Sequence, residues 1–287
     1  MTIRNPIEWA TDQFKLAGSA IGSASRAGIG AEHDLEAALP EVRHIGVDDL
    51  KEALARGFDD FAAYRTDVIF LCVVYPVIGL ILGRLAFGYG TLPLLFPLAS
   101  GFALVGPFAA VGLYEMSRRR EQGGNVAWPD AFGVVASRSF GAIIVLGLLL
   151  VAIFLLWLIA AESIYEMTLG PEPPVSLSSF VRDVFTTAAG WALIVIGVGV
   201  GFLFAVVALV ISVVLFPLLL DREVGLGTAV GTSVRAVMVN PVPMAVWGLI
   251  VASGLMLGSI PLFLGLIIVM PVLGHATWHL YRKVVPR

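Results

Sequence analysis

Two histidines near the end of the chain have a spacing that could support chemistry. His275 and His279 are four residues apart, so on a helix they share one face, as paired imidazoles do when they bind a metal or a haem. Two ligands do not complete a metal site, and the further donors expected on the same side are Glu115 and Asp221. A metal centre would therefore need side chains from several helices.

An ordinary membrane interface explains the same histidines. Their neighbours include Trp278, Tyr281 and Arg282, and aromatic and basic residues are enriched where helices leave a bilayer. We therefore predict no metal site, no cofactor and no catalytic residue. Whether His275 and His279 bind any ligand is left open by the sequence.

Charged residues at the predicted helix ends could form a second cluster. Glu115 could pair with Arg118 or with Arg222, and Asp221 and Glu223 flank the latter. Charges that flank membrane spans usually meet water and headgroups, and we favour this interpretation. No nucleophile, base and orienting residue occur together, and no glycine-rich phosphate loop follows a strand, so we do not predict an enzyme.

The composition places these residues in a membrane protein. Of 287 residues, 58% are hydrophobic and 14% are charged, and the mean hydropathy is +0.92. A soluble domain has roughly 45–50% apolar and about 25% charged residues. The net charge of −3 predicts no nucleic-acid partner, and the single cysteine, Cys72, excludes an intramolecular disulfide.

Six apolar blocks are long enough to be membrane spans, so the predicted fold is an all-α, polytopic transmembrane helical bundle. The spans are expected at residues 68–87, 91–116, 139–161, 187–218, 241–257 and 261–280, within a membrane domain of residues 47–287. Residues 1–46 are predicted to be a cytoplasmic segment, with an amphipathic stretch and a flexible linker rich in Gly, Ala and Ser.

The fourth span lies in the longest uncharged run, the 37 residues from Val184 to Leu220. We interpret it as one overlong span, with a kink or an interfacial extension, rather than as two helices. Gly197, Gly199 and Gly201 predict a seam where another helix packs closely, with the border of a cavity as the alternative. No ionisable residue is expected near the midplane of any span, which disfavours ion pumping.

The distribution of lysine and arginine predicts the orientation. With the N-terminus in the cytoplasm, 12 basic residues flank the spans on that side, whereas only Arg84 and Arg182 lie on the other. Because cytoplasmic loops are enriched in basic residues, we expect both termini in the cytoplasm and an even number of spans.

A moderately polar stretch precedes each odd-numbered span, at residues 49–64, 130–138 and 228–239. We interpret the chain as three units, each an amphipathic interface helix followed by a transmembrane hairpin. The alternative is three unrelated helices that happen to precede membrane entry.

The first interface helix has a clear apolar periodicity. Leu50, Leu54, Phe58 and Phe61 recur at helical spacing, and Asp59 and Asp60 are expected to face away from them. The helix is therefore predicted to lie at the membrane surface.

Several short motifs carry a resemblance to a known family. They are Asp49-Leu50-Lys51-Glu52-Ala53-Leu54, Tyr75-Pro76-Val77-Ile78-Gly79, Gly112-Leu113-Tyr114-Glu115, Phe216-Pro217-Leu218-Leu219-Leu220-Asp221 and Gly274-His275-Ala276-Thr277-Trp278-His279. Over residues 45–283 the chain resembles the bacterial integral membrane proteins grouped as DUF2189, a family without an established function. The resemblance implies a location in the bacterial inner membrane.

Some members of that family have been labelled as cytochrome c oxidase subunits. A haem–copper core needs about six membrane histidines, and this chain has four in total. A catalytic subunit is therefore not expected, while an accessory role beside a respiratory complex stays open.

Three functional hypotheses remain. The preferred one is a non-enzymatic structural, assembly or interaction protein of the membrane. The alternative is a transporter or lipid-handling protein with a cavity between the hairpins, lined by glycines and prolines of the second and fourth spans. The third is an accessory protein of a respiratory, cytochrome oxidase-type complex. The expected partners are membrane lipid and other membrane proteins.

Overall fold

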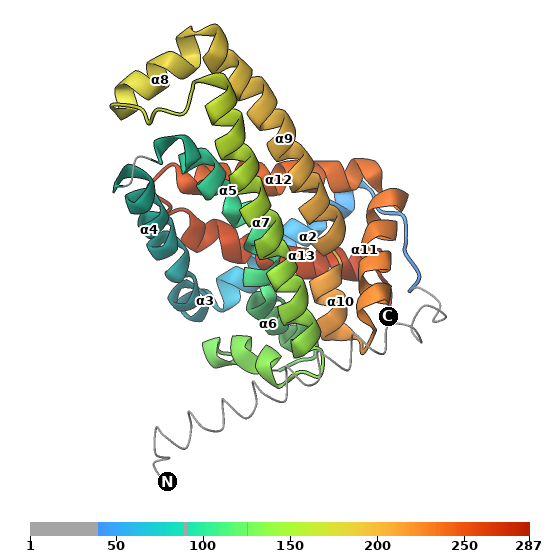
Figure 1. Ribbon diagram of the computed structural model, residues 1–287. Coiled ribbons are helices and arrows are strands. Elements are labelled where there is room, and N and C mark those ends of the chain that lie inside the picture. Colours follow the sequence, from blue (N-terminus) through green and yellow to red (C-terminus); the bar gives the residue numbers. More distant parts are fainter. Residues whose placement is uncertain (1–39, 89–90, 125) are drawn as a thin grey trace.

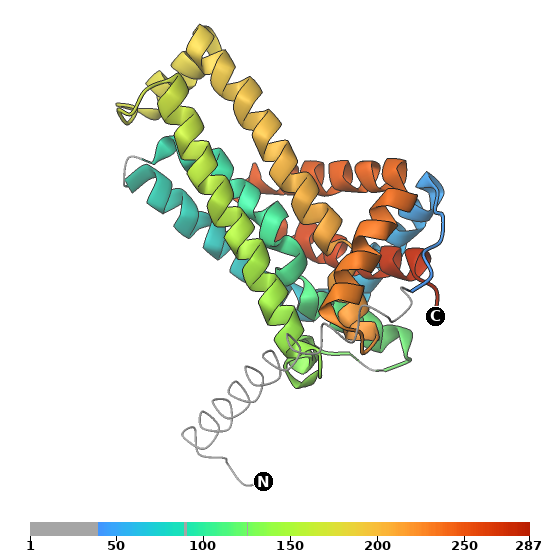
Figure 2. The ribbon, with the colours of Figure 1, turned by 45° about the vertical axis from the view of Figure 1, so that its right-hand side comes forward.

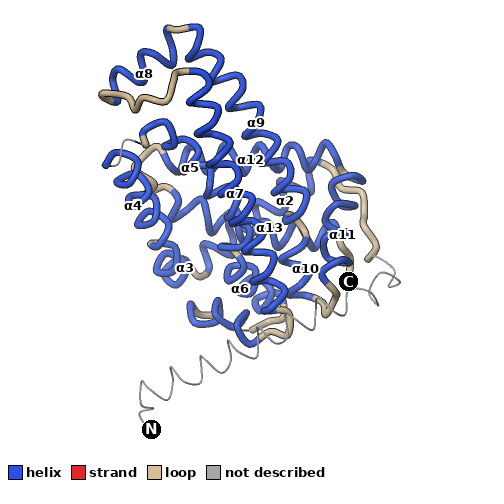
Figure 3. The backbone as a smooth tube through the Cα atoms, in the orientation of Figure 1, coloured by secondary structure: helices blue, strands red, loops and turns tan. Residues whose placement is uncertain are grey.

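The protein is helical throughout the part of the chain that the structure describes. The computed structural model describes residues 40–88, 91–124 and 126–287, and within these ranges it contains helices and no strand (Figures 1 and 3). Most of the predicted N-terminal segment, residues 1–39, lies outside the described residues. The all-helical fold class is confirmed.

The helices follow one another with short connections. In chain order they are α2 (Val47–Ala63), α3 (Arg65–Cys72), α4 (Val74–Gly88), the 3₁₀ helix η1 (Leu92–Leu94), α5 (Leu95–Ala109), α6 (Val111–Glu121), the 3₁₀ helix η2 (Trp128–Ala136), α7 (Phe140–Thr168), α8 (Leu177–Thr186), α9 (Ala188–Ser212), α10 (Leu215–Asp221), α11 (Leu226–Val239), α12 (Pro241–Ser259) and α13 (Leu266–Val284).

Five helical segments of the described chain are long and apolar enough to cross a membrane. They are Arg65–Arg84, Leu92–Glu121, Phe140–Thr168, Ala188–Asp221 and Pro241–Ser259. They correspond to the first five predicted spans. The sixth prediction, residues 261–280, is not among them: its first part is a turn with positive φ at Leu262 and Phe263, and α13 continues into a polar end that carries Arg282 and Lys283. The number of six spans is therefore not confirmed.

In two of the predicted spans the helix is interrupted about one turn before a proline. Pro76 and Pro217 lack the N–H that would donate to the carbonyl four residues earlier. The first span divides into α3 and α4 at Val73, and the fourth divides into α9 and α10 at Val213 and Val214. The fourth span, predicted to have a kink or an interfacial extension, is thus a long helix followed by a short one.

A serine from a neighbouring helix satisfies the backbone at the second of these breaks. The N–H of Val214 donates to Ser233 Oγ at 3.3 Å, and this hydroxyl donates to the carbonyl of Val210 at 2.8 Å. An unpaired backbone group in an apolar interior is costly, so the bond explains how the break is tolerated. Ser233 on α11 is fully buried, and these two hydrogen bonds satisfy its hydroxyl group there.

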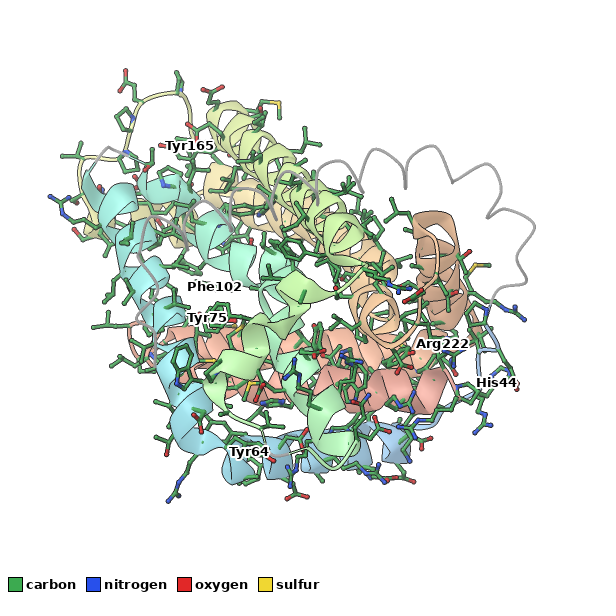
Figure 4. The ribbon with its side chains drawn as sticks, turned by 90° about the horizontal axis from the view of Figure 1, so that it is seen from below. His44, Tyr64, Tyr75, Phe102, Tyr165 and Arg222 are labelled. Atoms are coloured by element: carbon green, nitrogen blue, oxygen red, sulfur yellow. The ribbon has the colours of Figure 1, made fainter. Side chains whose placement is uncertain are left out.

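The helices form a long pair and a broader base. α7 and α9 run side by side and extend beyond the rest of the molecule, where α8 connects them (Figures 1 and 2). α12 and α13 lie across this pair, and α2 lies along α13 (Figures 2 and 4). The base holds the largest fully buried side chains, which include Trp247, Trp278, Tyr114 and Phe216.

The glycine seam predicted in the fourth span is wrong for two of its three residues within this chain. A Cβ atom at Gly197 or Gly199 would meet no atom within 4 Å, whereas one at Gly201 would lie 3.0 Å from the Trp157 ring. Most side chains around the first two, such as Val195 and Val198, are exposed. This part of α9 therefore faces the surroundings of the molecule.

Candidate functional site

α2 packs closely on α13 rather than lying free at a surface. A Cβ atom at Gly57 would come within 2.6 Å of the backbone nitrogen of Ala276, so the two helices approach as near as a glycine allows. The buried face of α2 includes Leu50, Ala53 and Asp60. Phe58, by contrast, is 55% exposed, so the predicted apolar face is rotated from the observed one.

The expectation that Asp60 faces away from the protein is therefore wrong, whereas Asp59 is exposed as expected. Asp60 is 5% exposed and lies between α6 and α13. The physical reason is that its carboxylate finds enough donors there to replace the water it loses. The apolar pattern of α2 contains no information about those donors.

Three side chains donate to the Asp60 carboxylate. Ser117 Oγ and His279 Nε2 lie 2.5 and 2.9 Å from Oδ2, and Arg120 Nη1 lies 2.5 Å from Oδ1. Ser117 Oγ also lies 2.7 Å from His275 Nδ1. Since Ser117 gives its hydrogen to Asp60, it accepts from His275, which is then the tautomer protonated on Nδ1. We call these five residues the Asp60 cluster.

The Asp60 cluster contains a serine, a histidine and an aspartate but not a catalytic triad. In a triad the aspartate orients the histidine, which in turn accepts the hydrogen of the serine. Here Ser117 donates directly to Asp60, and His275 Nδ1 lies 4.0 Å from the carboxylate. The other ring nitrogen, Nε2, is buried and has no hydrogen-bond partner among the described residues. These hydrogen bonds thus stabilise a carboxylate and do not activate a nucleophile.

Electrostatics also favour the charged form of Asp60. Burial raises its pKa, but hydrogen bonds from His279 and Ser117 and the nearby histidines outweigh this effect, so the pKa is lowered from its ordinary value. The carboxylate is therefore held ionised, with the positive charge of Arg120 beside it.

The structure brings the two predicted histidines together, although not at an exposed interface. His275 is fully buried, and the side chain of His279 is 13% exposed. Both interact with the Asp60 cluster, so the membrane-interface explanation is wrong for His275. No group of three or more His, Cys, Asp or Glu side chains within the described residues could hold a metal ion.

A second set of ion pairs joins α6 to η2. Glu115 is 2% exposed, and its two oxygens accept from Arg118 at 2.7 Å and from Arg119 at 2.8 Å. Arg119 also pairs with Asp130 of η2. Of the two partners that the sequence allowed for Glu115, the structure has Arg118, so the favoured interpretation of solvated charges is wrong for Glu115.

A third set joins the ends of α6, α10 and α13. Arg282 lies 2.9 Å from Asp221 and 3.2 Å from Glu121, and the Tyr281 hydroxyl donates to Asp221 at 2.7 Å. Arg222, labelled in Figure 4, lies 3.9 Å from Asp221. The charged residues at these helix ends therefore form a polar cluster, which the sequence allowed but did not favour.

We call the Asp60 cluster and these two sets of ion pairs the polar layer. A cleft lies between α5, α9, α12 and α13, and none of its lining residues belongs to the polar layer. Its volume is about 340 Å³, and no Asp, Glu, Lys, Arg or His is among its lining residues. Gly106 and Pro107 come from the second predicted span, as the lipid-handling hypothesis expects, but the fourth contributes large side chains such as Phe202. Tyr114, Ser212 and Thr277 supply hydroxyl groups.

Comparison with known proteins identifies one part of the chain. Residues 95–221 match the DUF2189 family, described as a predicted integral membrane protein. The matched range is shorter than residues 45–283, over which the sequence motifs resemble the family. No curated protein and no solved structure matches the chain significantly.

The DUF2189 segment covers α5 to α10 and includes Ser117, Arg120 and Glu115. Asp60, His275 and His279 lie outside the DUF2189 match. Sequence reasoning missed Asp60 and Ser117 as members of one cluster. Their separation of 57 positions leaves no local signal, although an aspartate one turn from the buried Gly57 was a usable hint.

Proposed function

We propose that the protein handles lipid by holding the apolar part of a membrane lipid in the cleft between α5, α9, α12 and α13. The observation that carries this proposal is the cleft itself, about 340 Å³ with an apolar lining free of charged side chains. Ligand pockets in proteins range from about 300 to 1,000 Å³, so the volume suits one chain better than a whole diacyl lipid.

The mouth of the cleft supports a lipid rather than a water-soluble ligand. Phe202 and Leu249 line the cleft and are 64% and 66% exposed, so its rim is apolar. A membrane span with such a rim meets hydrocarbon there, and an acyl chain that fills the cleft gains the dispersion contacts that an empty one lacks. The lack of charge argues against a pathway for ions.

We further propose that the polar layer faces the cytoplasm of a bacterium, with the protein in the inner membrane. The N–H of Arg43 donates to the carbonyl of Val284 at 2.8 Å, so the two ends of the described chain meet on one side. This contact supports an even number of crossings. The arginines near that side, at positions 118–120, 222 and 282, favour a cytoplasmic location.

The structural, assembly or interaction role stays a prediction, as does an accessory role beside a respiratory complex. The buried face of α2 contacts α13 of the same chain, so it is not available to a partner. The three interface-helix-plus-hairpin units also remain an interpretation, supported by α2, η2 and α11, each of which precedes a segment long and apolar enough to cross a membrane.

A variant that fills the cleft tests the lipid proposal. Ala252 lines the cleft and is exposed within it, so Ala252→Phe should occupy the space with a phenyl ring. Ala152 on α7 is equally exposed but lies outside the cleft, which makes Ala152→Phe the matched control. After purification in mild detergent, mass spectrometry of bound lipid should show retention by the wild type and by Ala152→Phe, and loss of most of it from Ala252→Phe.

Equal retention by both variants would contradict the proposal. Thermal unfolding of the two variants should be measured alongside, because a folded Ala252→Phe protein is needed for the comparison. Its side chain enters existing space, so we expect little loss of stability from overpacking.

A further inference from the structure

The cleft occupies one half of the membrane depth, as its position along α9 shows. Trp191, near the start of α9, is 54% exposed, and tryptophan is enriched at the interfaces of a bilayer. At 1.5 Å per residue, Phe202 lies about 17 Å and Ser212 about 32 Å beyond Trp191 along the helix. A hydrocarbon core is about 30 Å thick. The lining residues of α9, from Phe202 to Ser212, therefore lie beyond its midplane, away from α8.

An exposed arginine marks the second interface at the matching depth. Ser233 of α11 accepts from the N–H of Val214 and donates to the carbonyl of Val210, so α11 is level here with the end of α9. Arg235 follows two residues later and is exposed. A long basic side chain on an apolar helix extends its charge to the headgroups. The hydrocarbon core therefore ends near Ser212, at one end of the cleft.

The polar side chains of the cleft lie toward this second interface. Tyr114, Ser212 and Thr277 are the hydroxyl-bearing residues among its lining. Tyr114 immediately precedes Glu115, and Thr277 lies two residues before His279, so both adjoin the polar layer in the chain. The first lining residues of α5 and of α9, by contrast, are phenylalanines. The lining thus changes from apolar near the midplane to more polar near the headgroups.

The cleft opens sideways, toward the bilayer. Its exposed lining residues all belong to α9 and α12, whereas Tyr114, Ser212 and Trp247 are at most 2% exposed. Within the described chain, no lining residue belongs to α7, to α8 or to the first half of α9. An acyl chain can therefore enter between α9 and α12 without passing the end of the molecule that carries α8.

We propose that the cleft takes the acyl chain of a phospholipid from the leaflet next to the polar layer, through the opening between α9 and α12. This inference rests on the proposed lipid-binding function. A lipid of that leaflet has its headgroup at the level of Arg235, its ester groups near the hydroxyl-bearing end of the cleft and its chain against the phenylalanines. A lipid of the opposite leaflet would reach the cleft only with the end of its chain, which places the hydroxyl groups against hydrocarbon. In the proposed topology, the source is the cytoplasmic leaflet.

Photolabelling from one leaflet at a time tests this inference. Full-length protein with Ser178→Cys on α8 is reconstituted into phosphatidylcholine vesicles, and a phosphatidylcholine with a diazirine on its acyl chain is exchanged into their outer leaflet. A membrane-impermeant biotin maleimide marks the molecules whose α8 faces outward, since Ser178 is exposed and Cys72 is buried. After illumination, avidin separates the two orientations and mass spectrometry locates the label. Gln122→Cys, after α6, gives the reciprocal selection.

Two controls accompany the measurement. Dithionite bleaching of a trace of NBD-labelled lipid, exchanged in the same way, verifies that the probe is still in one leaflet at illumination. Ala252→Phe fills the cleft and should remove the label from its buried lining, whereas Ala152→Phe should keep it.

Molecules with the polar layer outward should carry the label on Tyr114, Ser212 and Trp247, which are too deeply buried for the surrounding lipid to reach. Molecules with α8 outward should lose most of this label. They should instead be labelled near Val195, which is 68% exposed on the first half of α9.

The outcomes separate the two proposals. If the buried lining takes no label from either leaflet, or keeps it in Ala252→Phe, the lipid-binding function itself fails. If the lining is labelled equally from both leaflets, or mainly from the leaflet next to α8, lipid binding stands and the assignment of the leaflet is refuted.

Discussion

At the scale of single residues, Asp60 links three helices through one buried carboxylate. It accepts from Ser117 and Arg120 of α6 and from His279 of α13, while its own backbone belongs to α2. Removing one partner from a buried set of charged hydrogen bonds leaves the others without compensation. The position should therefore matter more for stability than its exposed neighbour.

Asp60→Asn should destabilise the protein by about 3 kcal/mol, because a neutral amide cannot satisfy the same three donors. Asp59→Asn, which changes an exposed carboxylate on the same helix, is the control and should have little effect. Thermal unfolding in detergent measures both. Equal stabilities of the two variants would show that the Asp60 cluster is dispensable.

The contribution of Asp60 to stability should depend on pH, and comparing the wild type with Asp60→Asn measures this dependence. The folded-state pKa of Asp60 is lowered, so its contribution is fully present above the ordinary value of 3.8 and is lost as the pH falls through the folded-state pKa. The stability difference between the wild type and Asp60→Asn should therefore be constant near neutral pH and shrink only in strong acid.

At the scale of elements, the buried face of α2 packs against other helices of the same chain, chiefly α13. Gly57 permits the close approach to α13, and Lys283 pairs with Asp49 at 3.2 Å near the start of the helix. Preceding it, the N–H of Ile45 donates to Asn240 Oδ1 at 2.8 Å, so the entry to the helix is also held. These contacts explain why an amphipathic helix packs on protein rather than on lipid.

Gly57→Ala should loosen this packing. The added Cβ would lie 2.7 Å from the Cα of Ala276, and backbone cannot move aside as a flexible side chain can. Overpacking of this kind costs about 1–3 kcal/mol. Trypsin should then cleave the exposed sites at Lys51 and Arg56 faster than in the wild type.

The control is Gly197→Ala, since a Cβ there meets open space. It should leave trypsin cleavage of α2 unchanged and increase helix stability by about 0.5–1 kcal/mol. A destabilised Gly197→Ala would instead support a packing seam with another molecule. Unchanged cleavage in Gly57→Ala would contradict the close contact between α2 and α13.

At the scale of the whole molecule, α8 lies at one end of the α7 and α9 pair, and α6 and α10, which carry ion pairs of the polar layer, lie toward the other (Figure 1). α7 has 29 residues, which at 1.5 Å per residue makes it about 43 Å long, enough to pass through a bilayer core of about 30 Å and both interfaces. The two ends should therefore face different compartments.

Cysteine labelling tests this arrangement. Ser178→Cys on α8 should react with a membrane-impermeant maleimide in intact cells, whereas Gln122→Cys after α6 should react only after permeabilisation. The native Cys72 is 1% exposed and should give no background. Labelling of both positions from the same side would overturn the proposed topology.

The sequence predicted the elements that depend on local properties. The apolar blocks located the five candidate spans, and the prolines marked irregular places within them. The six-span count did not follow, because α13 combines an apolar first half with a polar second half that is buried by α2, α6 and α10. Hydropathy averages over such a helix and cannot register which residues its neighbours cover.

Residence in a membrane and the all-helical class were determined by the sequence alone, because both depend on the amount of apolar surface and on its arrangement in long blocks. The tertiary structure alone decided that Asp60, Ser117 and the two histidines form one cluster, and that a cleft remains between α5, α9, α12 and α13. The physical reason is that hydrogen bonds and cavities depend on distances between helices far apart in the chain, and periodicity records only the faces of each helix.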